Sequence, residues 1–250
     1  PGILMGAGLA VAWWWLARSD DHAVHEKQSW SDVGKAFVEG IWALFLPAII
    51  ILGLKFGIFT PTEAAVVAAV YSLFVAMVIY RELKVSQLFE VFVAAAKSTG
   101  IVMFLVAAAL VAAYFITIAD LPGQVVTLLQ PLMGNQTLLL LAIMGILFAV
   151  GMAMDLTPIV LILTPVLMPV VKQAGIDPIY FGVLFVVVGS IGLITPPVGT
   201  VLNVVAGATK SSMGQVVKGV VPFLISDTIV VLLLVFFPWL VTVPAKWFSG

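Results

Sequence analysis

Two apolar stretches of the sequence are interrupted near their middles by glycine, threonine and proline, and these interruptions are where chemistry is expected. The first is 151–158 (GMAMDLTP) and the second is 189–197 (GSIGLITPP). A helix that opens in an apolar environment leaves unpaired carbonyl oxygens at the end of its first half and unpaired N–H groups at the start of its second half. Such carbonyls can coordinate Na⁺, and such N–H groups attract anions. The pattern therefore indicates an ion or carboxylate site built largely from backbone atoms.

Each interruption contains a threonine–proline pair that predicts where the helix restarts. Thr157 and Thr195 are favourable N-cap residues, and the prolines that follow them suit the first helical position. Asp155 is an ionisable residue in an apolar run and is a functional candidate for that reason. The residues alone leave other interpretations open. Each pair could simply kink a helix, and Asp155 could simply cap one. Asn203 could contact a substrate or a neighbouring helix.

Composition decides which solvent surrounds these stretches. Of 250 residues, 63% are hydrophobic and 9% are charged, the mean hydropathy is +1.24 and the formal net charge is −1. A soluble domain has about 25% charged residues. A soluble enzyme, a nucleic-acid binder and a disordered tail are therefore poor interpretations, and a lipid bilayer is the expected partner. The chain has no cysteine, which excludes disulfides and thiolate metal sites.

The apolar residues form several segments that could cross a bilayer, which takes about 20 residues. We expect spans at 1–17, 41–54, 62–80, 98–118 and 219–243. Thr60, Pro61 and Glu63 have the spacing of a capping box that starts the helix over 62–80. The polar stretches 18–40 and 81–97 have the pattern of helices that lie in the membrane interface.

The interrupted stretches are 136–172 and 179–210. Each flank of the first has about 15 residues, which at about 1.5 Å per residue reach only roughly 22 Å. A hairpin that enters and leaves from one side places eight of the eleven basic residues on the cytoplasmic side. A full crossing makes the charge distribution nearly even, so the charges favour a re-entrant hairpin with its tip near Asp155.

Other kinds of chemistry find little support. His22 and His25 lie together in one polar loop, away from the apolar stretches, and the chain has no glycine-rich phosphate loop with a lysine. No catalytic residues and no metal other than sodium are expected. An intramembrane enzyme with Asp155 as its catalytic acid is expected to have a second acid or a histidine beside it at membrane depth, and none is apparent. The interpretation as a purely structural subunit gives no reason for the two opened helices.

Three stretches resemble the large membrane subunit of tripartite ATP-independent periplasmic (TRAP) transporters. They are 57–65 (GIFTPTEAA), 151–158 with Thr164, Pro165 and Pro169, and 189–199 (GSIGLITPPVG) with Asn203. The order and spacing match over nearly the whole chain. The chain resembles the later part of such a subunit, with the first repeat expected upstream of it.

The resemblance implies an all-α integral membrane protein with the elevator fold of the ion-transporter superfamily. This chain would hold the second inverted repeat, with a re-entrant hairpin and a broken transmembrane helix. Residues 1–135 would form scaffold spans and interfacial arm helices, and 211–250 the last span and C-terminus. Residues 136–210 would be half of a transport domain, made of the hairpin 136–172 and the broken helix 179–210.

The resemblance also implies a site. Sodium would bind carbonyl oxygens near Gly151, Gly192 and Val198, together with the Thr195 hydroxyl. These are oxygen ligands of the kind that a hard cation prefers. The residues implied at the hairpin tip and near the substrate are Met152, Asp155, Thr157, Pro158, Pro196, Pro197 and Asn203.

The function implied is that of a multi-pass permease in the bacterial inner membrane. It would import organic acids, such as C4-dicarboxylates or sialic-acid-like carboxylates, with a sodium gradient and an elevator movement. Its partners would be a small membrane (Q) subunit and a periplasmic substrate-binding (P) protein, with no nucleic acid. The alternative is a dicarboxylate/sodium symporter that works without a binding protein.

Overall fold

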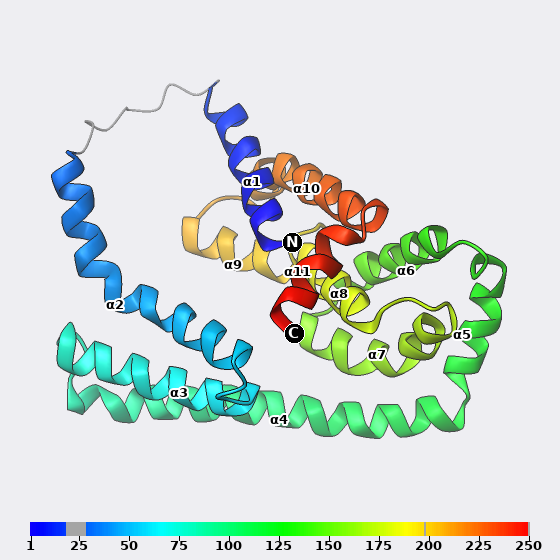
Figure 1. Ribbon diagram of the computed structural model, residues 1–250, viewed down its shortest axis with the longest axis horizontal. Coiled ribbons are helices and arrows are strands. Elements are labelled where there is room, and N and C mark those ends of the chain that lie inside the picture. Colours follow the sequence, from blue (N-terminus) through cyan, green and yellow to red (C-terminus); the bar gives the residue numbers. More distant parts are fainter. Residues whose placement is uncertain (19–28, 198, 250) are drawn as a thin grey trace. The chain divides into compact units, whose positions relative to one another are not determined.

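The structure, a computed structural model, describes residues 1–18, 29–197 and 199–249, and its regular elements in these ranges are all helical (Figure 1). The α-helices are α1 (Gly2–Ala17), α2 (Trp30–Lys55), α3 (Pro61–Phe74), α4 (Leu88–Ile118), α5 (Leu121–Leu129), α6 (Gln136–Gly151), α7 (Leu156–Gln173), α8 (Pro178–Leu193), α9 (Thr200–Thr209), α10 (Met213–Phe236) and α11 (Trp239–Ser249). Short helices of other types are η1 (Val75–Ile79), η2 (Val85–Gln87) and η3 (Gln130–Leu132). The all-α fold class is thereby confirmed.

The described residues up to 248 fall into two compact units, one of residues 1–18, 102–197 and 199–248 and the other of residues 29–101. In the second unit, α3 packs on α2. The Tyr71 hydroxyl donates to the Trp42 carbonyl at 2.7 Å, and the Tyr80 hydroxyl donates to the Glu39 carbonyl at 2.7 Å. These bonds tie α3 and the residue after η1 to the middle of α2.

The helix α3 begins where the sequence predicts. Thr60 is the N-cap, and its hydroxyl accepts from the Glu63 N–H at 3.3 Å. The Glu63 carboxylate in turn accepts from the Thr60 N–H at 2.8 Å, with Pro61 at the first helical position. The capping box is therefore confirmed.

The core of the first unit lies where α6, α7 and α8 meet each other and α10. The helix α8 is apolar on all sides, a pattern typical of a buried helix, and it contacts α6, α7, α9 and α10. Side chains with essentially no exposed surface come from all four of these core-forming helices: Leu139, Ile143, Leu147, Ile159, Val170, Val171, Phe181, Leu184, Leu234 and Val235. The core thus holds both flanks of the first interruption against the first half of the second.

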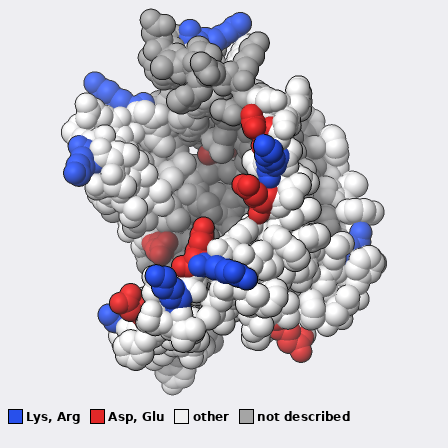
Figure 2. All heavy atoms as spheres, turned by 90° about the vertical axis from the view of Figure 1, so that its left-hand side faces the viewer, with Lys and Arg blue, Asp and Glu red and all other residues white. Residues whose placement is uncertain are grey.

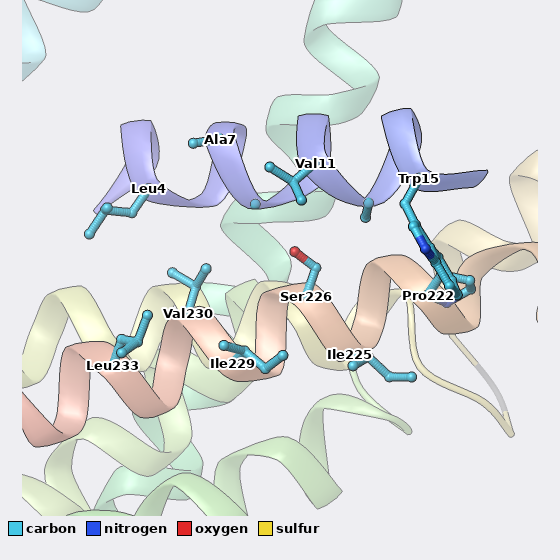
Figure 3. Close-up of a pocket in the computed structure, with 12 residues that line it drawn as sticks. Leu4, Ala7, Val11, Trp15, Pro222, Ile225, Ser226, Ile229, Val230 and Leu233 are labelled. Atoms are coloured by element: carbon cyan, nitrogen blue, oxygen red, sulfur yellow. The ribbon is translucent and has the colours of Figure 1, made fainter. Parts of the chain in front are cut away.

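The helix α1 packs along α10 (Figure 3). A Cβ atom added at Gly8 would lie 2.8 Å from the Ser226 hydroxyl oxygen and 3.2 Å from a methyl carbon of Val230, so glycine allows this close approach. A groove of about 680 Å³ runs between the two helices, with Leu4 and Val11 on one wall and Ile229 on the other.

Within the described ranges, five helical segments are long and apolar enough to cross a membrane: Trp30–Lys55, Pro61–Ile79, Val85–Ile118, Leu156–Gln173 and Met213–Phe236. Most of their side chains are exposed in the isolated chain, including that of Phe104 at 75%. Figure 2 shows that residues other than Lys, Arg, Asp and Glu cover most of one face. Such a surface needs lipid or protein around it.

The expected spans differ from the structure in several ways. The helix α1, at the expected first span 1–17, has 16 residues and is not among these five segments, whereas Leu156–Gln173, one arm of the expected hairpin, is. The expected last span, 219–243, is divided, because α10 ends at Phe236 and α11 begins at Trp239. Pro238 explains the division, since the residue before a proline is disfavoured in helical backbone. The polar stretches expected at the interface are also continuous with the spans after them: α2 includes both 30–40 and 41–54, and α4 joins 88–97 to 98–118.

Candidate functional site

Both apolar stretches are interrupted where the sequence indicates. In the first, α6 ends at Gly151 and α7 begins at Leu156, so four residues leave the helix. In the second, α8 ends at Leu193 and α9 begins at Thr200. Neither stretch is a kinked continuous helix.

The helix α7 begins earlier than predicted, and its cap is different. The N-cap is Asp155, whose Oδ1 accepts from the Leu156 N–H at 2.8 Å. The prediction that Thr157 is the N-cap and Pro158 the first helical residue is therefore wrong. Both lie within the first turn, where N–H groups have no intrahelical acceptor, so a proline there removes no helix bond. Asp155 itself is exposed, as is Thr157.

The helix α9 begins later than predicted. Its N-cap is Gly199, so the prediction that Thr195 and Pro196 restart the helix is wrong. Pro197 supplies a reason, because it disfavours helical backbone at Pro196. Thr195 instead closes the end of α8: its side chain is 7% exposed, and its hydroxyl donates to the Ile191 carbonyl at 2.7 Å.

The two interruptions meet at a contact between glycines. A Cβ added at Gly192 would lie 2.6 Å from the Cα of Gly151 and 2.7 Å from its carbonyl carbon. A Cβ added at Gly151 would lie 3.0 Å from the Cα of Gly192 and 3.3 Å from the Gly189 carbonyl oxygen. Real Cβ atoms essentially never come within 3.0 Å of another heavy atom of this kind, so this approach of α6 to α8 requires glycine.

Two further contacts join the hairpin tip to the broken helix. The Gly199 N–H donates to the Met152 carbonyl at 3.3 Å, which links the residue that caps α9 to the first residue after α6. A Cβ at Gly189 would lie 2.6 Å from a methyl carbon of Leu156, so the first residue of α7 also packs against the backbone of α8. The structure thus brings Gly151, Met152 and Gly192 together with Gly199.

The oxygen atoms at this meeting point suit a hard cation. Several of the last carbonyls of α6 and α8 accept hydrogen bonds from the turn residues that follow: Val150 from the Ala153 and Met154 N–H groups at 3.0 Å, Ile191 from the Ile194 N–H at 3.1 Å, and Gly192 from the Thr195 N–H at 3.0 Å. A carbonyl or hydroxyl oxygen has two lone pairs, so Gly192 and Thr195 keep acceptor capacity. The ends of both helices also carry partial negative charge. Among the described residues, no three Asp, Glu, His or Cys side chains gather in a way that could hold a metal.

The other predicted site residues lie around this point or outside the described ranges. Pro158 and Pro196 are half-buried, and Pro197 is exposed. Asn203 lies on α9, one turn after Gly199, and its N–H donates to the Gly199 carbonyl at 3.4 Å. Val198, predicted as a sodium ligand, lies outside the described residues, as do His22 and His25.

Sequence reasoning missed one residue. Asp227 lies in α10 and is 3% exposed; among the described residues, only it and Thr195 are buried polar side chains. An acid inside an apolar span was the available signal.

The sequence model of the family described as "Tripartite ATP-independent periplasmic transporter, DctM component" matches residues 1–240. The chain is 53% identical over its whole length to the 2,3-diketo-L-gulonate TRAP transporter large permease protein YiaN of Escherichia coli. It is 52% identical over 99% of its length to a putative TRAP transporter large permease protein of Haemophilus influenzae. It is 34% identical over 95% of its length to the C4-dicarboxylate TRAP transporter large permease protein DctM of Pseudomonas aeruginosa.

The chain spans 59%, 58% and 56% of the lengths of these three relatives. All three are named as transporter permeases, which are not enzymes. Together with the membrane-length helices, these matches place the chain in the bacterial inner membrane as a multi-pass protein. It belongs to the family of TRAP transporter large permease (DctM) components.

Proposed function

We propose that the chain is the part of a sodium-coupled secondary transporter that holds one sodium site and one side of the substrate cavity. The observation that carries the proposal is the meeting of two helix ends at Gly151 and Gly192, where backbone of α6 and α8 is nearly in contact. Opened helices in lipid are tolerated only around a protein-lined or water-filled site. An ion held there would offset the partial negative charge of both helix ends.

The sodium ligands in this proposal are the carbonyl oxygens near Gly151, Gly192 and Val198 and the hydroxyl of Thr195. The hydroxyl already donates to Ile191, so its lone pairs face away from that bond and are free to accept an ion. Asp155 caps α7 at the tip and adds negative charge there without being required as a ligand. The Gly199–Met152 hydrogen bond would make sodium binding order both the tip and the start of α9.

The substrate in this proposal is an organic acid. Its carboxylate would bind near the tip of the hairpin, among Met152, Thr157, Pro197 and Asn203. The first turns of α7 and α9 present N–H groups that suit an anion. Two relatives are named for 2,3-diketo-L-gulonate and for C4-dicarboxylates, and both names denote carboxylates. Sodium would favour substrate binding by fixing these helix starts, which is linkage between two ligands.

Movement in this proposal follows an elevator mechanism. Residues 136–210 would form half of a transport domain that slides against scaffold spans in 1–135, with 211–250 as the last span. The partners would be a small membrane (Q) subunit and a periplasmic substrate-binding (P) protein. The packing of α6, α7 and α8 into one core supports their movement as a unit.

The test is uptake of a labelled organic acid by proteoliposomes that contain the full-length permease and its small subunit. An inward sodium gradient should drive uptake when the binding protein is supplied, and dissipating that gradient should abolish it. Uptake that a proton gradient drives and a sodium gradient leaves unchanged would refute sodium coupling. Uptake that needs no binding protein would instead favour the binding-protein-independent symporter.

A further inference from the structure

Asp227 lies in the membrane-length helix α10, and its carboxyl group is buried with one oxygen that has no hydrogen-bond partner among the described residues. The residue is 3% exposed, and its Oδ1 finds no partner among the described residues. Any further protein or lipid around this chain can only reduce that exposure. Buried polar groups are normally hydrogen-bonded, so this one requires an explanation.

The neighbours of Asp227 on α10 show which way it faces. Ser226 and Val230 face α1, as Figure 3 shows and as their proximity to Gly8 requires. One turn before Asp227, Phe223 lines a cavity of about 390 Å³ together with Ile194, the C-cap residue of α8. One turn after it, Val231 lines a cavity of about 200 Å³ together with Ile191 of α8.

Residues four apart lie on the same face of a helix, so Asp227 shares its face with Phe223 and Val231. That face meets α8 at its last turn, between the levels of Ile191 and Ile194. The last turn of α8 is also where the helix opens and where Thr195 donates back to Ile191. Asp227 therefore lies beside the negative end of the helix whose interruption forms the candidate ion site.

In the part of the chain that the structure describes, no positive side chain on the helices packed against α10 faces this carboxyl group. The helices α1, α6 and α9 contain no ionisable side chain, and α8 contains only Tyr180. The Tyr180 hydroxyl donates to the Leu234 carbonyl at 2.9 Å, about two turns farther along α10 than Asp227. Lys218 of α10 itself is exposed, more than two turns before Asp227. An ionised carboxylate here would face apolar side chains and a helix end of its own sign.

We propose that Asp227 is a proton-binding site: its carboxyl group carries a proton in the state shown, and loss of that proton to water leaves a negative charge beside the last turn of α8. Proton transfer breaks the carboxyl O–H bond and forms a new O–H bond on a water molecule, which carries the proton away. The second part of the proposal rests on the proposed function: a proton on Asp227 and a sodium ion at the α8 break influence each other's affinity. The negative charge left by deprotonation attracts sodium, so protonation weakens sodium binding.

The first experiment examines the proton directly, without transport. Infrared spectra of the full-length permease in lipid should contain the carbonyl stretch of a protonated carboxyl group at neutral pH, shifted in D₂O and absent in Asp227→Asn. The control is Asp177→Asn, because Asp177 is an exposed cap of α8 and asparagine caps equally well. Spectra in which Asp227→Asn removes no such band would overturn the proposal, and would mean that a cation or a basic side chain neutralises the carboxylate.

The second experiment uses the isosteric variant to separate a neutral acid from an ionised one. Asp227→Asn replaces a neutral group by a neutral group, so it should keep the parent melting temperature at neutral pH. A carboxylate paired with a cation would lose that partner in Asp227→Asn, and a marked fall in melting temperature would refute the proposal. In the parent, the apparent sodium affinity should weaken several-fold as the pH falls from alkaline values, where Asp227 is ionised, to neutrality, and in Asp227→Asn it should not depend on pH in this range. Sodium binding that is absent in both proteins would refute the proposed function while leaving the infrared result standing.

Discussion

The contact between Gly151 and Gly192 allows a quantitative test with one methyl group. A Cβ in Gly192→Ala would lie 2.6 Å from the Cα of Gly151, whereas ordinary van der Waals contact begins at 3.4 Å. The backbones of α6 and α8 must therefore separate locally by about 0.8 Å, since the obstructing atoms are backbone rather than a flexible side chain. Overpacking of this kind costs about 1–3 kcal/mol. Alanine recovers up to about 1 kcal/mol of helix propensity, which leaves a net destabilisation of about 0–2 kcal/mol.

The same separation should weaken ion binding more than it lowers the stability of the fold. Cation–oxygen distances are fixed to within a few tenths of an ångström, so carbonyls that move apart by about 0.8 Å cannot all remain ligands. A loss of about 1.4 kcal/mol in binding weakens sodium affinity about tenfold. We expect Gly192→Ala to weaken it by at least that factor while the protein remains folded.

The assay is the rise in melting temperature of the purified full-length permease as sodium is added, with potassium as the reference salt. The matched control is Gly182→Ala in the same helix, because a Cβ there meets nothing within 4 Å. Gly182→Ala should keep the parent's sodium response and gain slightly in stability. The reasoning is refuted if both variants respond to sodium as the parent does, since the close approach of α6 to α8 would then have no part in ion binding.

The remaining predictions concern single hydrogen-bonding groups. Thr195→Ala should weaken sodium activation of uptake and Thr195→Ser should largely restore it, because serine keeps the hydroxyl; equal activation in all three proteins would remove Thr195 from the site. Asp155→Ala should lower the stability of α7 by about 0.5–2 kcal/mol and Thr157→Ala by less, as hydrogen exchange of the first turn would report, whereas the reverse order would restore Thr157 as the cap. Tyr180→Phe should lower the free energy of unfolding by about 0.5–1.5 kcal/mol, as thermal unfolding would report, and Tyr114→Phe, on an exposed ring, should leave it without a measurable change.

The positions of the helix interruptions could be predicted from the sequence, but their caps could not. At Thr60 the cap, the proline and the glutamate occupy one short motif, so only one register satisfies all three. At the start of α7, Asp155 and Thr157 are both N-cap residues, and Pro158 is compatible with either because the whole first turn lacks intrahelical N–H bonds. Local rules therefore left two registers, and tertiary packing of Leu156 against Gly189 is consistent with the earlier one.

The second interruption and Asp227 show two different limits. The Pro196–Pro197 pair did contain the signal against an early restart, since a proline disfavours helix at the residue before it. The burial of Asp227 had no such local signal. Whether an acid in an apolar span faces lipid, water or a neighbouring helix depends on which helices pack beside it, and that is a property of the tertiary fold.

The last turn of α8 connects the two proposed ion sites. This turn meets Gly151 through Gly192. Its residue Ile191 and the C-cap residue Ile194 line cavities with Val231 and Phe223, which share the face of α10 that carries Asp227. A sodium ion on the first side and a negative charge on the second stabilise each other, and a sodium ion and a proton on Asp227 do not. By reciprocity, each must change the other's affinity by the same factor. Sodium binding should therefore release a proton in a fraction of molecules that rises as the pH approaches the midpoint of the Asp227 titration. Weakly buffered permease should acidify its medium when sodium is added, and Asp227→Asn should not.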